Sequence, residues 1–252
     1  QMVRILILLM CLAWPASAEQ VVLGLSKDKV DITTSFDGSE ILIFGAVKRE
    51  MPIPQGEPLE VIITVSGPSV PVTVRRKEKR FGIWVNTDVL EVDKAPSFYA
   101  IATSAPLFKA LTDTEDLRHR VSIPRAIRSV GAPQNISDAE NFTDAVIRIR
   151  TENRLYQLLQ EYVVVDEQTL FRTAIEMPAN LTEGNYVIRI FLTRGGEVVS
   201  SYDTQIDVYK VGLERWLFGL SREQPLIYGL MSLAIAIAAG WGASAIFKLF
   251  RA

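Results

Sequence analysis

The sequence predicts a mainly β fold with two Ig-like, β-sandwich-type lobes joined by a helical segment, followed by one C-terminal transmembrane helix. Three observations support this fold class. Short β-branched runs separated by Gly and Pro fill residues 19–105 and 161–210, and such runs are typical of antiparallel sandwiches. Apolar side chains in residues 106–160 recur at helical spacing instead. Residues 225–247 contain no charged side chain, which is typical of a membrane-spanning helix.

The first 18 residues resemble a secretory signal peptide. Arg4 precedes an uncharged run over residues 5–14, and the small-x-small sequence Ala16-Ser17-Ala18 follows. This layout is typical of a signal cleaved after Ala18, whereas a membrane span needs about twenty apolar residues. We therefore expect cleavage, which would remove Cys11, the only cysteine in the chain. An uncleaved N-terminal anchor is the alternative.

The N-terminal lobe, residues 19–105, contains several strand-length runs bounded by turn residues. These runs cover residues 30–33, 41–44, 59–66, 70–76 and 81–86. We expect Trp84, in the last of them, to lie in the core; a platform for a ligand is the alternative. Regular short strands of this kind predict an antiparallel sandwich or barrel.

The strongest cluster of positive charge lies between the last two of these runs. It consists of Arg75, Arg76, Lys77, Lys79 and Arg80. One interpretation is a solvated hairpin tip, because long basic side chains protect sheet edges. The other is a binding site for an anion, a lipid headgroup or an acidic partner surface.

The connecting segment, residues 106–160, predicts a helix that begins at a capping box formed by Ser137 and Glu140. The apolar side chains at helical spacing are Phe142, Ala145, Val146, Ile149, Tyr156 and Leu159. The C-terminal lobe, residues 161–210, has strand-length runs at 162–165, 169–176, 186–193 and 198–209. Gly195-Gly196 predicts a hairpin turn between the last two. A single composite sandwich built from both strand-rich ranges is the alternative to two lobes.

Composition limits the chemistry that the chain can carry. One Cys and one His exclude zinc fingers, His-rich metal sites, iron-sulfur clusters and disulfide scaffolds. His119 lies between Arg118 and Arg120, where an exposed residue at a helix end or in a loop is expected. The neighbouring acids, Asp113, Glu115 and Asp116, are expected to be solvated rather than to bind a metal. The sequence therefore predicts no catalytic residue, no metal site, no cofactor and no enzymatic activity.

The charge balance gives no support to nucleic-acid binding. Residues 19–224 hold all 29 acidic groups and 24 of the 27 basic groups, a formal charge of −5. Proteins that bind nucleic acid present a net positive surface instead.

The C-terminal part predicts a membrane anchor and its orientation. As a helix, residues 225–247 would rise about 34 Å, enough to cross a hydrocarbon core of about 30 Å. Lys248 and Arg251 follow in the short tail 248–252, and positive charge favours the cytoplasmic side. The bilayer is thus one predicted partner, with the strand-rich body outside the cytoplasm.

Two further patterns accompany the anchor. In residues 211–224, one helical face carries Leu213, Trp216, Leu217 and Leu220, which is typical of an amphipathic helix lying at the membrane surface. Continuation of the membrane helix is the alternative. Within the span, small residues recur every four positions: Ser232, Ala236, Gly240 and Ser244. Such a stripe lets a second helix approach closely, although membrane helices are rich in Ala and Gly in any case.

Motifs spread along the chain carry a family resemblance. They include Ile43-Phe44-Gly45, Gly82-Ile83-Trp84-Val85-Asn86, Leu170-Phe171-Arg172 and Gln224-Pro225-Leu226-Ile227-Tyr228-Gly229. Over residues 21–251 the chain resembles Alph_Pro_TM, a transmembrane protein family of alphaproteobacteria. The resemblance implies a bacterial inner-membrane protein with a periplasmic body and supplies no known activity or functional residues. It also suggests a partner, a multi-span TauE/SafE-type permease implicated in sulfite or organosulfonate export.

Two functional classes follow from these patterns. The first, which we favour, is an accessory or interaction subunit for a membrane partner. The alternative is a periplasmic solute-binding protein or a metal-independent envelope enzyme with a cleft between the lobes. A flat body with one basic or apolar patch would favour the first class, and a deep pocket with convergent polar groups would favour the second.

Overall fold

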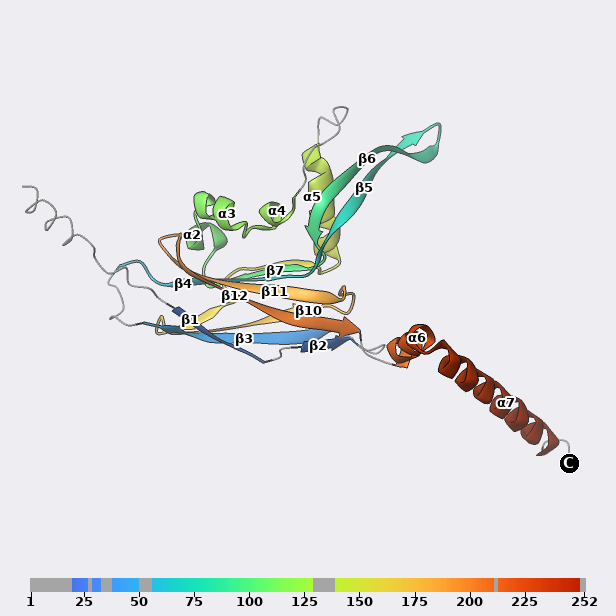
Figure 1. Ribbon diagram of the computed structural model, residues 1–252. Coiled ribbons are helices and arrows are strands. Elements are labelled where there is room, and N and C mark those ends of the chain that lie inside the picture. The colour runs from blue at the N-terminus through green and yellow to red at the C-terminus, as the bar shows by residue number, and fades with distance from the viewer. Residues whose placement is uncertain are drawn as a thin grey trace, which may run out of the picture. The chain divides into compact units, whose positions relative to one another are not determined.

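The computed structural model describes residues 20–26, 29–32, 38–49, 56–128, 139–210 and 213–249. The expected signal peptide and the expected cap at Ser137 lie outside these ranges. The chain divides into two compact units, one of Gln1–Val30 and Asp37–Val208, the other of Asp31–Phe36 and Tyr209–Ala252. The first unit is rich in strands, and the second carries the two C-terminal helices (Figure 1).

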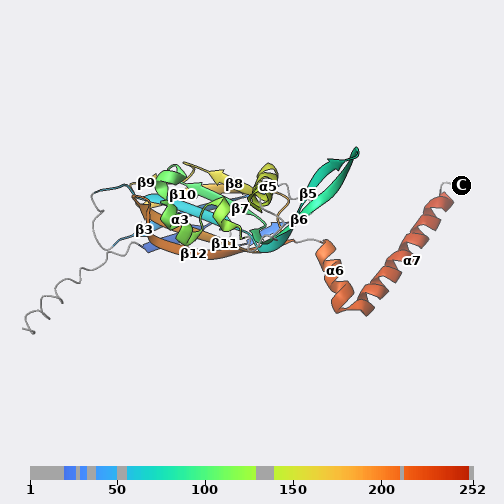
Figure 2. The same cartoon turned by 90° about the horizontal axis from the view of Figure 1, so that it is seen from above.

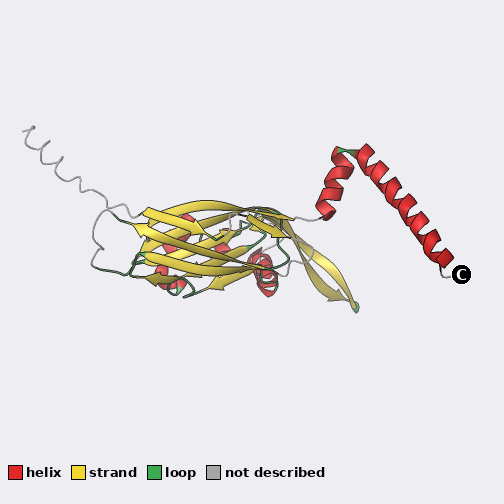
Figure 3. Ribbon diagram, turned by 90° about the horizontal axis from the view of Figure 1, so that it is seen from below, coloured by secondary structure: helices red, strands yellow, loops and turns green. Residues whose placement is uncertain are grey.

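Two sheets face each other in the strand-rich unit (Figures 1 and 3). The four-stranded sheet has the order β1 (Gln20–Leu25), β3 (Ser39–Lys48), β10 (Leu170–Met177) and β9 (Val164–Asp166). The six-stranded sheet has the order β2 (Lys29–Ile32), β12 (Glu197–Lys210), β11 (Gly184–Arg194), β4 (Glu60–Ser66), β7 (Tyr99–Thr103) and β8 (Tyr156–Leu159). The mainly β class and the sandwich architecture are confirmed.

Strands from both ends of the sequence share both sheets. β10 pairs with β3 from Leu170↔Ala46 to Met177↔Ser39, and β11 pairs with β4 in the other sheet. The expectation of separate lobes at 19–105 and 161–210 is therefore corrected to the composite sandwich, the alternative left open above. Alternation of apolar residues shows which side of a strand is buried but not which strand lies beside it. Closing a longer loop costs little additional entropy, so strands far apart in sequence can pair.

The central strand β4 is buried on both faces. Val61, Ile63 and Val65 are almost completely buried on one face. Ile62 lies on the other face, in a cluster with Tyr99, Phe191 and side chains from the helical segment. A strand covered on both sides reads as a continuous apolar run, as residues 61–65 do.

The helical segment covers the outer face of the six-stranded sheet (Figure 2). It consists of α2 (Leu107–Ala110), α3 (Asp113–His119), α4 (Ile123–Ala126) and α5 (Ala139–Glu152). The helix expected to continue to residue 160 ends at Glu152, and Tyr156 and Leu159 lie in β8, which pairs parallel to β7. Arg154 has a left-handed backbone with φ 58°, which reverses the chain and lets Tyr156 bury its ring in the sheet.

A two-stranded arm extends from this body (Figures 1 and 2). It consists of β5 (Ser69–Arg80) and β6 (Ile83–Pro96), which pair only with each other among the described strands. Helix α5 packs on its inner part, where Phe142 joins the buried Leu90 and the Arg76 guanidinium carbon lies 4.6 Å from the Phe142 ring centroid. The arm is thus anchored at one end.

The second unit contains α6 (Leu213–Glu223) and α7 (Pro225–Leu249). Gln224 separates them, and Pro225 occupies the first position of α7, where its missing N–H removes no helical hydrogen bond. The segment before the span is therefore a helix of its own rather than a continuation of the membrane helix. The predicted C-terminal apolar helix is confirmed.

Candidate functional site

The turn of the arm has an unusual conformation. Phe81 and Gly82 form a two-residue connection with φ of 50° and 85°, and Arg80 pairs with Ile83 across it. Two consecutive positive φ values are typical of a type I′ hairpin, which normally takes Asn or Gly at its first position. A bulky residue with positive φ is a genuine outlier. Phe81 is therefore held in a conformation that its side chain disfavours.

The arm tip, residues 77–85, exposes three large apolar side chains. Phe81 is 106% exposed, Trp84 68% and Ile83 66%. Trp84 was expected in the core, and the structure places it on the surface because none of the described elements forms a second layer over this end of the two-stranded arm. Lys79 lies directly opposite Trp84 in the strand register. The tip thus combines aromatic surface with cations.

The predicted basic cluster lies on β5 itself, since that strand continues to Arg80. Arg76 forms an ion pair with Asp88 at 3.5 Å, and Arg80 forms one with Glu78 at 3.3 Å. Both are surface pairs that contribute little stability. Lys77 and Lys79 have no ion pair among the described residues. The structure therefore brings the cluster to the arm and leaves much of its charge available.

A second feature, which the sequence did not indicate, is a groove of about 510 Å³ on the strand-rich unit. Strand β11, the end of β6 and the segment from α3 to α4 form its walls. We call it the cationic groove because its lining includes Lys94, His119, Arg120, Arg125, Arg128 and Arg189. No carboxylate from the described residues lines it.

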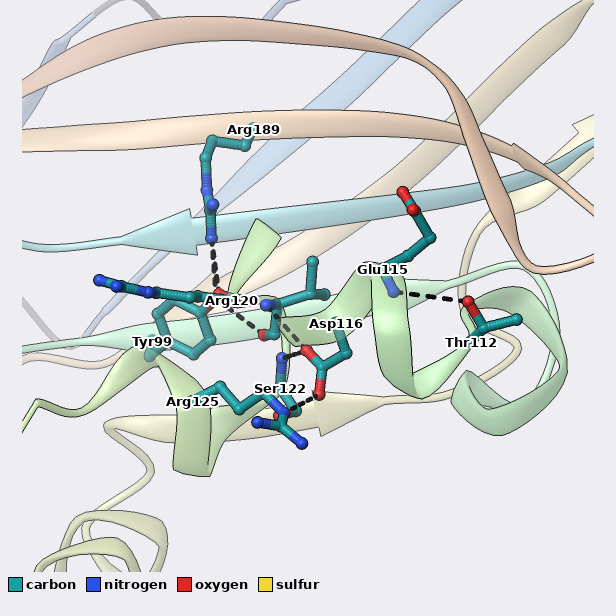
Figure 4. Close-up of polar contacts among 9 residues, drawn as sticks. Tyr99, Thr112, Glu115, Asp116, Arg120, Ser122, Arg125 and Arg189 are labelled. Carbon is teal, nitrogen blue, oxygen red and sulfur yellow. Dashed lines mark hydrogen bonds and ion pairs between the residues drawn. The ribbon is translucent and has the colours of Figure 1, made fainter. Parts of the chain in front are cut away.

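Asp116 holds the loop at one wall of this groove (Figure 4). Its carboxylate accepts hydrogen bonds from the backbone N–H groups of Val121 and Ser122 at 3.0 and 2.7 Å. It also accepts from Arg125 Nε at 3.0 Å. A solvated acid was expected at this position, but the side chain is only 15% exposed. The Asp116 carboxylate therefore has a structural role, since it fixes the backbone of Val121 and Ser122.

Arg189, on strand β11, forms hydrogen bonds to the same loop from the side of the sheet (Figure 4). Its guanidinium donates to the carbonyls of His119 and Arg120 at 2.7 and 3.1 Å and to the Tyr99 hydroxyl at 3.1 Å. The Tyr99 hydroxyl donates in turn to the Val121 carbonyl at 2.8 Å. Burial raises the pKa of Tyr99, so the phenol stays protonated and available as a donor.

His119 was expected to be an exposed residue at a helix end or in a loop. It lies in the last turn of α3, with its side chain 27% exposed and Nε2 at 3.4 Å from the Glu115 carboxylate. Its ring centroid is 5.3 Å from that of Phe191. Within the described ranges, no three His, Cys, Asp or Glu side chains come together in a way that could hold a metal ion.

Helix α7 is long and apolar enough to cross a membrane over Pro225–Ser244. The predicted small residues, Ser232, Ala236, Gly240 and Ser244, lie along it. A Cβ added to Gly240 would meet no heavy atom within 4 Å, so this chain's own packing does not require glycine there. Leu217 and Leu220 of α6 are partly buried; the side chains of Leu213 and Trp216 lie outside the described part.

The family described as Putative transmembrane protein (Alph_Pro_TM) matches residues 20–249. The chain belongs to this family. No curated protein matches it. As an Alph_Pro_TM protein with one helix of membrane-spanning length in its described part, it is a membrane protein.

The sequence of this Alph_Pro_TM protein indicates the basic residues of the arm. It does not indicate that the aromatic side chains beside them are exposed. The cationic groove was missed because Lys94, Arg128 and Arg189 are far apart in sequence and meet only through strand pairing. A usable signal was the density of arginine between positions 118 and 128.

Proposed function

We propose that this Alph_Pro_TM protein is a non-enzymatic accessory subunit that binds a membrane protein partner through its arm tip. It is a single-pass inner-membrane protein with its strand-rich body in the periplasm and its C-terminus in the cytoplasm. The orientation rests on the signal-like N-terminus and on Lys248 and Arg251 after the span.

The observation that carries the proposal is the composition of the arm tip. Phe81 projects fully into solvent from a left-handed backbone, and strain of this kind is often retained where it serves function. Trp84 stands opposite Lys79, and Arg80 is close by. Trp and Arg are the residue types that dominate binding energy at protein interfaces. A partner surface with an apolar pocket and an acidic rim would match this tip.

A protein partner explains more of the chain than a lipid surface does. Helix α7 already supplies attachment to the bilayer. Its small-residue stripe favours contact with another helix, because lipid satisfies apolar side chains and close packing must drive association. A partner with several spans and a periplasmic surface could engage α7 and the arm tip together, and two linked contacts bind more tightly than either alone. A TauE/SafE-type permease is the first candidate.

The arm tip is tested by photo-crosslinking in native membranes. A photoreactive amino acid at Trp84 is expected to give a discrete protein adduct. The matched control places the same group at Phe108, which is 77% exposed on α2 and outside the arm. Adducts with lipid alone at Trp84, or the same adducts from both positions, would rule out the proposed contact.

The orientation is tested by cysteine labelling. The chain downstream of residue 18 contains no cysteine, so single cysteines can be introduced as unique targets. Lys79→Cys should react with a membrane-impermeant maleimide in intact spheroplasts, and Ala252→Cys should react only after lysis. The opposite pattern would reverse the proposed topology.

A further inference from the structure

We infer that the cationic groove binds a phosphate or sulfate group, either free or at the end of a larger molecule. This inference does not depend on the proposed partner contact, since the groove and the arm tip are separate surfaces. It assigns a ligand class to a site that no sequence motif marks.

The first argument is local charge. Among the residues that the structure describes, five Lys and Arg side chains and no carboxylate line the groove, although residues 19–224 carry a formal charge of −5. Only Arg125 has an ion-pair partner among the described residues, Asp116 at 3.0 Å. Lys94, Arg120 and Arg128 have none there. Like charges held close together repel each other, and a bound dianion would relieve this repulsion.

The second argument is preorganisation. Arg189 is held in place by three hydrogen bonds from its guanidinium, to the His119 and Arg120 carbonyls and to the Tyr99 hydroxyl. Asp116 fixes the backbone of residues 121 and 122 in the opposite wall. The groove is therefore shaped by the protein's own contacts before any ligand binds, which lowers the entropy cost of binding.

The third argument is the fit between donors and ligand. Guanidinium groups match the oxygen spacing of phosphate and sulfate and bind them with paired hydrogen bonds. Ser66, Ser69 and Asn185 add neutral hydrogen-bonding groups to the lining. A volume of about 510 Å³ lies within the usual range for small-ligand sites, so a larger molecule carrying the anionic group also fits.

Four acids lie near the groove without lining it. Asp116 contacts Arg125, Glu115 lies 3.4 Å from His119 Nε2, and the other two belong to β12. Asp203 pairs with Arg189 and Asp207 with Asn185 in the register of β11 and β12. Neither belongs to the lining, and the described residues show no ion pair between Asp203 and Arg189. The acids of β12 make the electrostatic potential less positive along the β11 side of the groove, so we expect the ligand on the side of Lys94 and Arg128.

The test is calorimetric titration of the full chain in phosphatidylcholine nanodiscs with inorganic phosphate and with sulfate, at ionic strength held constant with chloride. We expect saturable binding that weakens about tenfold in Arg128→Gln, because a hydrogen bond to a charged group is lost. Lys94→Gln should act in the same direction. The control Arg148→Gln removes an exposed arginine on α5 outside the groove and should leave the dissociation constant unchanged.

A competition experiment identifies the source of the anion. If phosphatidylglycerol in the nanodisc competes with inorganic phosphate, the site takes a lipid headgroup; if it does not, the site takes a soluble anion. Either result supports the site. Absence of saturable binding to the wild type, or equal affinity in wild type, Arg128→Gln and Lys94→Gln, would overturn the inference. Thermal unfolding of each variant separates lost binding from lost folding.

Discussion

At the scale of single residues, Asp116 shows how one carboxylate organises a segment. It accepts from two backbone N–H groups and from Arg125, and it thereby fixes the connection between α3 and α4. A neutral amide at this position would keep the shape but lose the charge-assisted hydrogen bonds, which are roughly twice as strong as neutral ones.

We expect Asp116→Asn to lower the free energy of unfolding by about 1–3 kcal/mol. Urea unfolding of the full chain in detergent, followed by tryptophan fluorescence, would measure the change. Asp113→Asn, at an exposed position at the start of α3, is the matched control and should change stability by less than about 0.5 kcal/mol. Equal effects of the two substitutions would contradict the role given to Asp116.

Tyr186 gives a prediction about pH. Burial raises the pKa of Tyr186 to about 12, and its hydroxyl donates to the Thr182 carbonyl at 2.8 Å. The unfolded chain loses this proton near pH 10, so the unfolded state binds fewer protons between pH 10 and 12. Stability present below pH 10 is therefore lost as the pH rises toward 12, by up to roughly 3 kcal/mol from this residue.

Tyr186→Phe should lower the free energy of unfolding by about 1 kcal/mol at neutral pH, because the hydrogen bond is lost. Above pH 10 its stability should fall less than that of the wild type. Urea unfolding between pH 8 and 11.5 measures both effects. The remaining fall reports in part on Tyr99 and Tyr156, whose pKa values are also raised by burial. A pH profile identical to that of the wild type would refute the assignment to Tyr186.

At the scale of elements, the arm joins a stable base to a strained tip. Leu90 and Phe142 bury its inner end, whereas Phe81 occupies a left-handed position that glycine adopts at no steric cost. At Phe81, the stability of the arm and the partner contact that we propose for it therefore favour different residues.

Phe81→Gly should raise the free energy of unfolding by about 1 kcal/mol, since it relieves the left-handed strain. The same change should reduce partner recovery in co-purification from native membranes. Phe108→Gly removes an aromatic side chain of similar exposure outside the arm and should leave recovery unchanged. A destabilised Phe81→Gly protein would show that the strain argument is wrong.

Helix α7 gives the second prediction at this scale. Gly240→Leu meets open space in this chain, so the helix itself should insert normally. The added side chain would keep a partner helix from approaching, and we expect loss of the detergent-stable complex on native gels. Ala238→Leu, about 200° around the helix from Gly240, should preserve it. A complex unaffected by Gly240→Leu would argue against this interface.

At the scale of the whole molecule, the two strand-rich ranges are one folding unit. β3 needs β10 as its neighbour, and β4 needs β11. A strand without its partner exposes unpaired backbone groups and an apolar face.

We therefore expect a fragment of residues 19–160 to remain unfolded or aggregate, whereas residues 19–210 should fold. Dispersion of amide signals in a proton-nitrogen NMR spectrum would distinguish the two states. A well-dispersed spectrum from the shorter fragment would restore the two-lobe description.

Local patterns predicted much of this fold and less of its surface. Most strand positions followed from β-branched runs, and the anchor followed from the uncharged run before Lys248. The helix expected up to residue 160 ends at Glu152. Tyr156 instead lies in β8 beside β7, where burial of its ring stabilises the fold more than another helical turn would. Trp84 was misplaced because hydrophobicity indicates burial only where another layer is present to cover the side chain.

From the residues alone we could recognise the class of most segments, the membrane helix, the basic cluster of the arm and the family. These properties depend on residues close together in the chain, where periodicity and charge can be read directly. Three features required the packed fold: the strands form one sandwich, the arm tip exposes aromatic as well as basic side chains, and Lys94, Arg128 and Arg189 line one groove. Pairing and burial depend on which distant segments meet, and that is set by the packing of the whole chain.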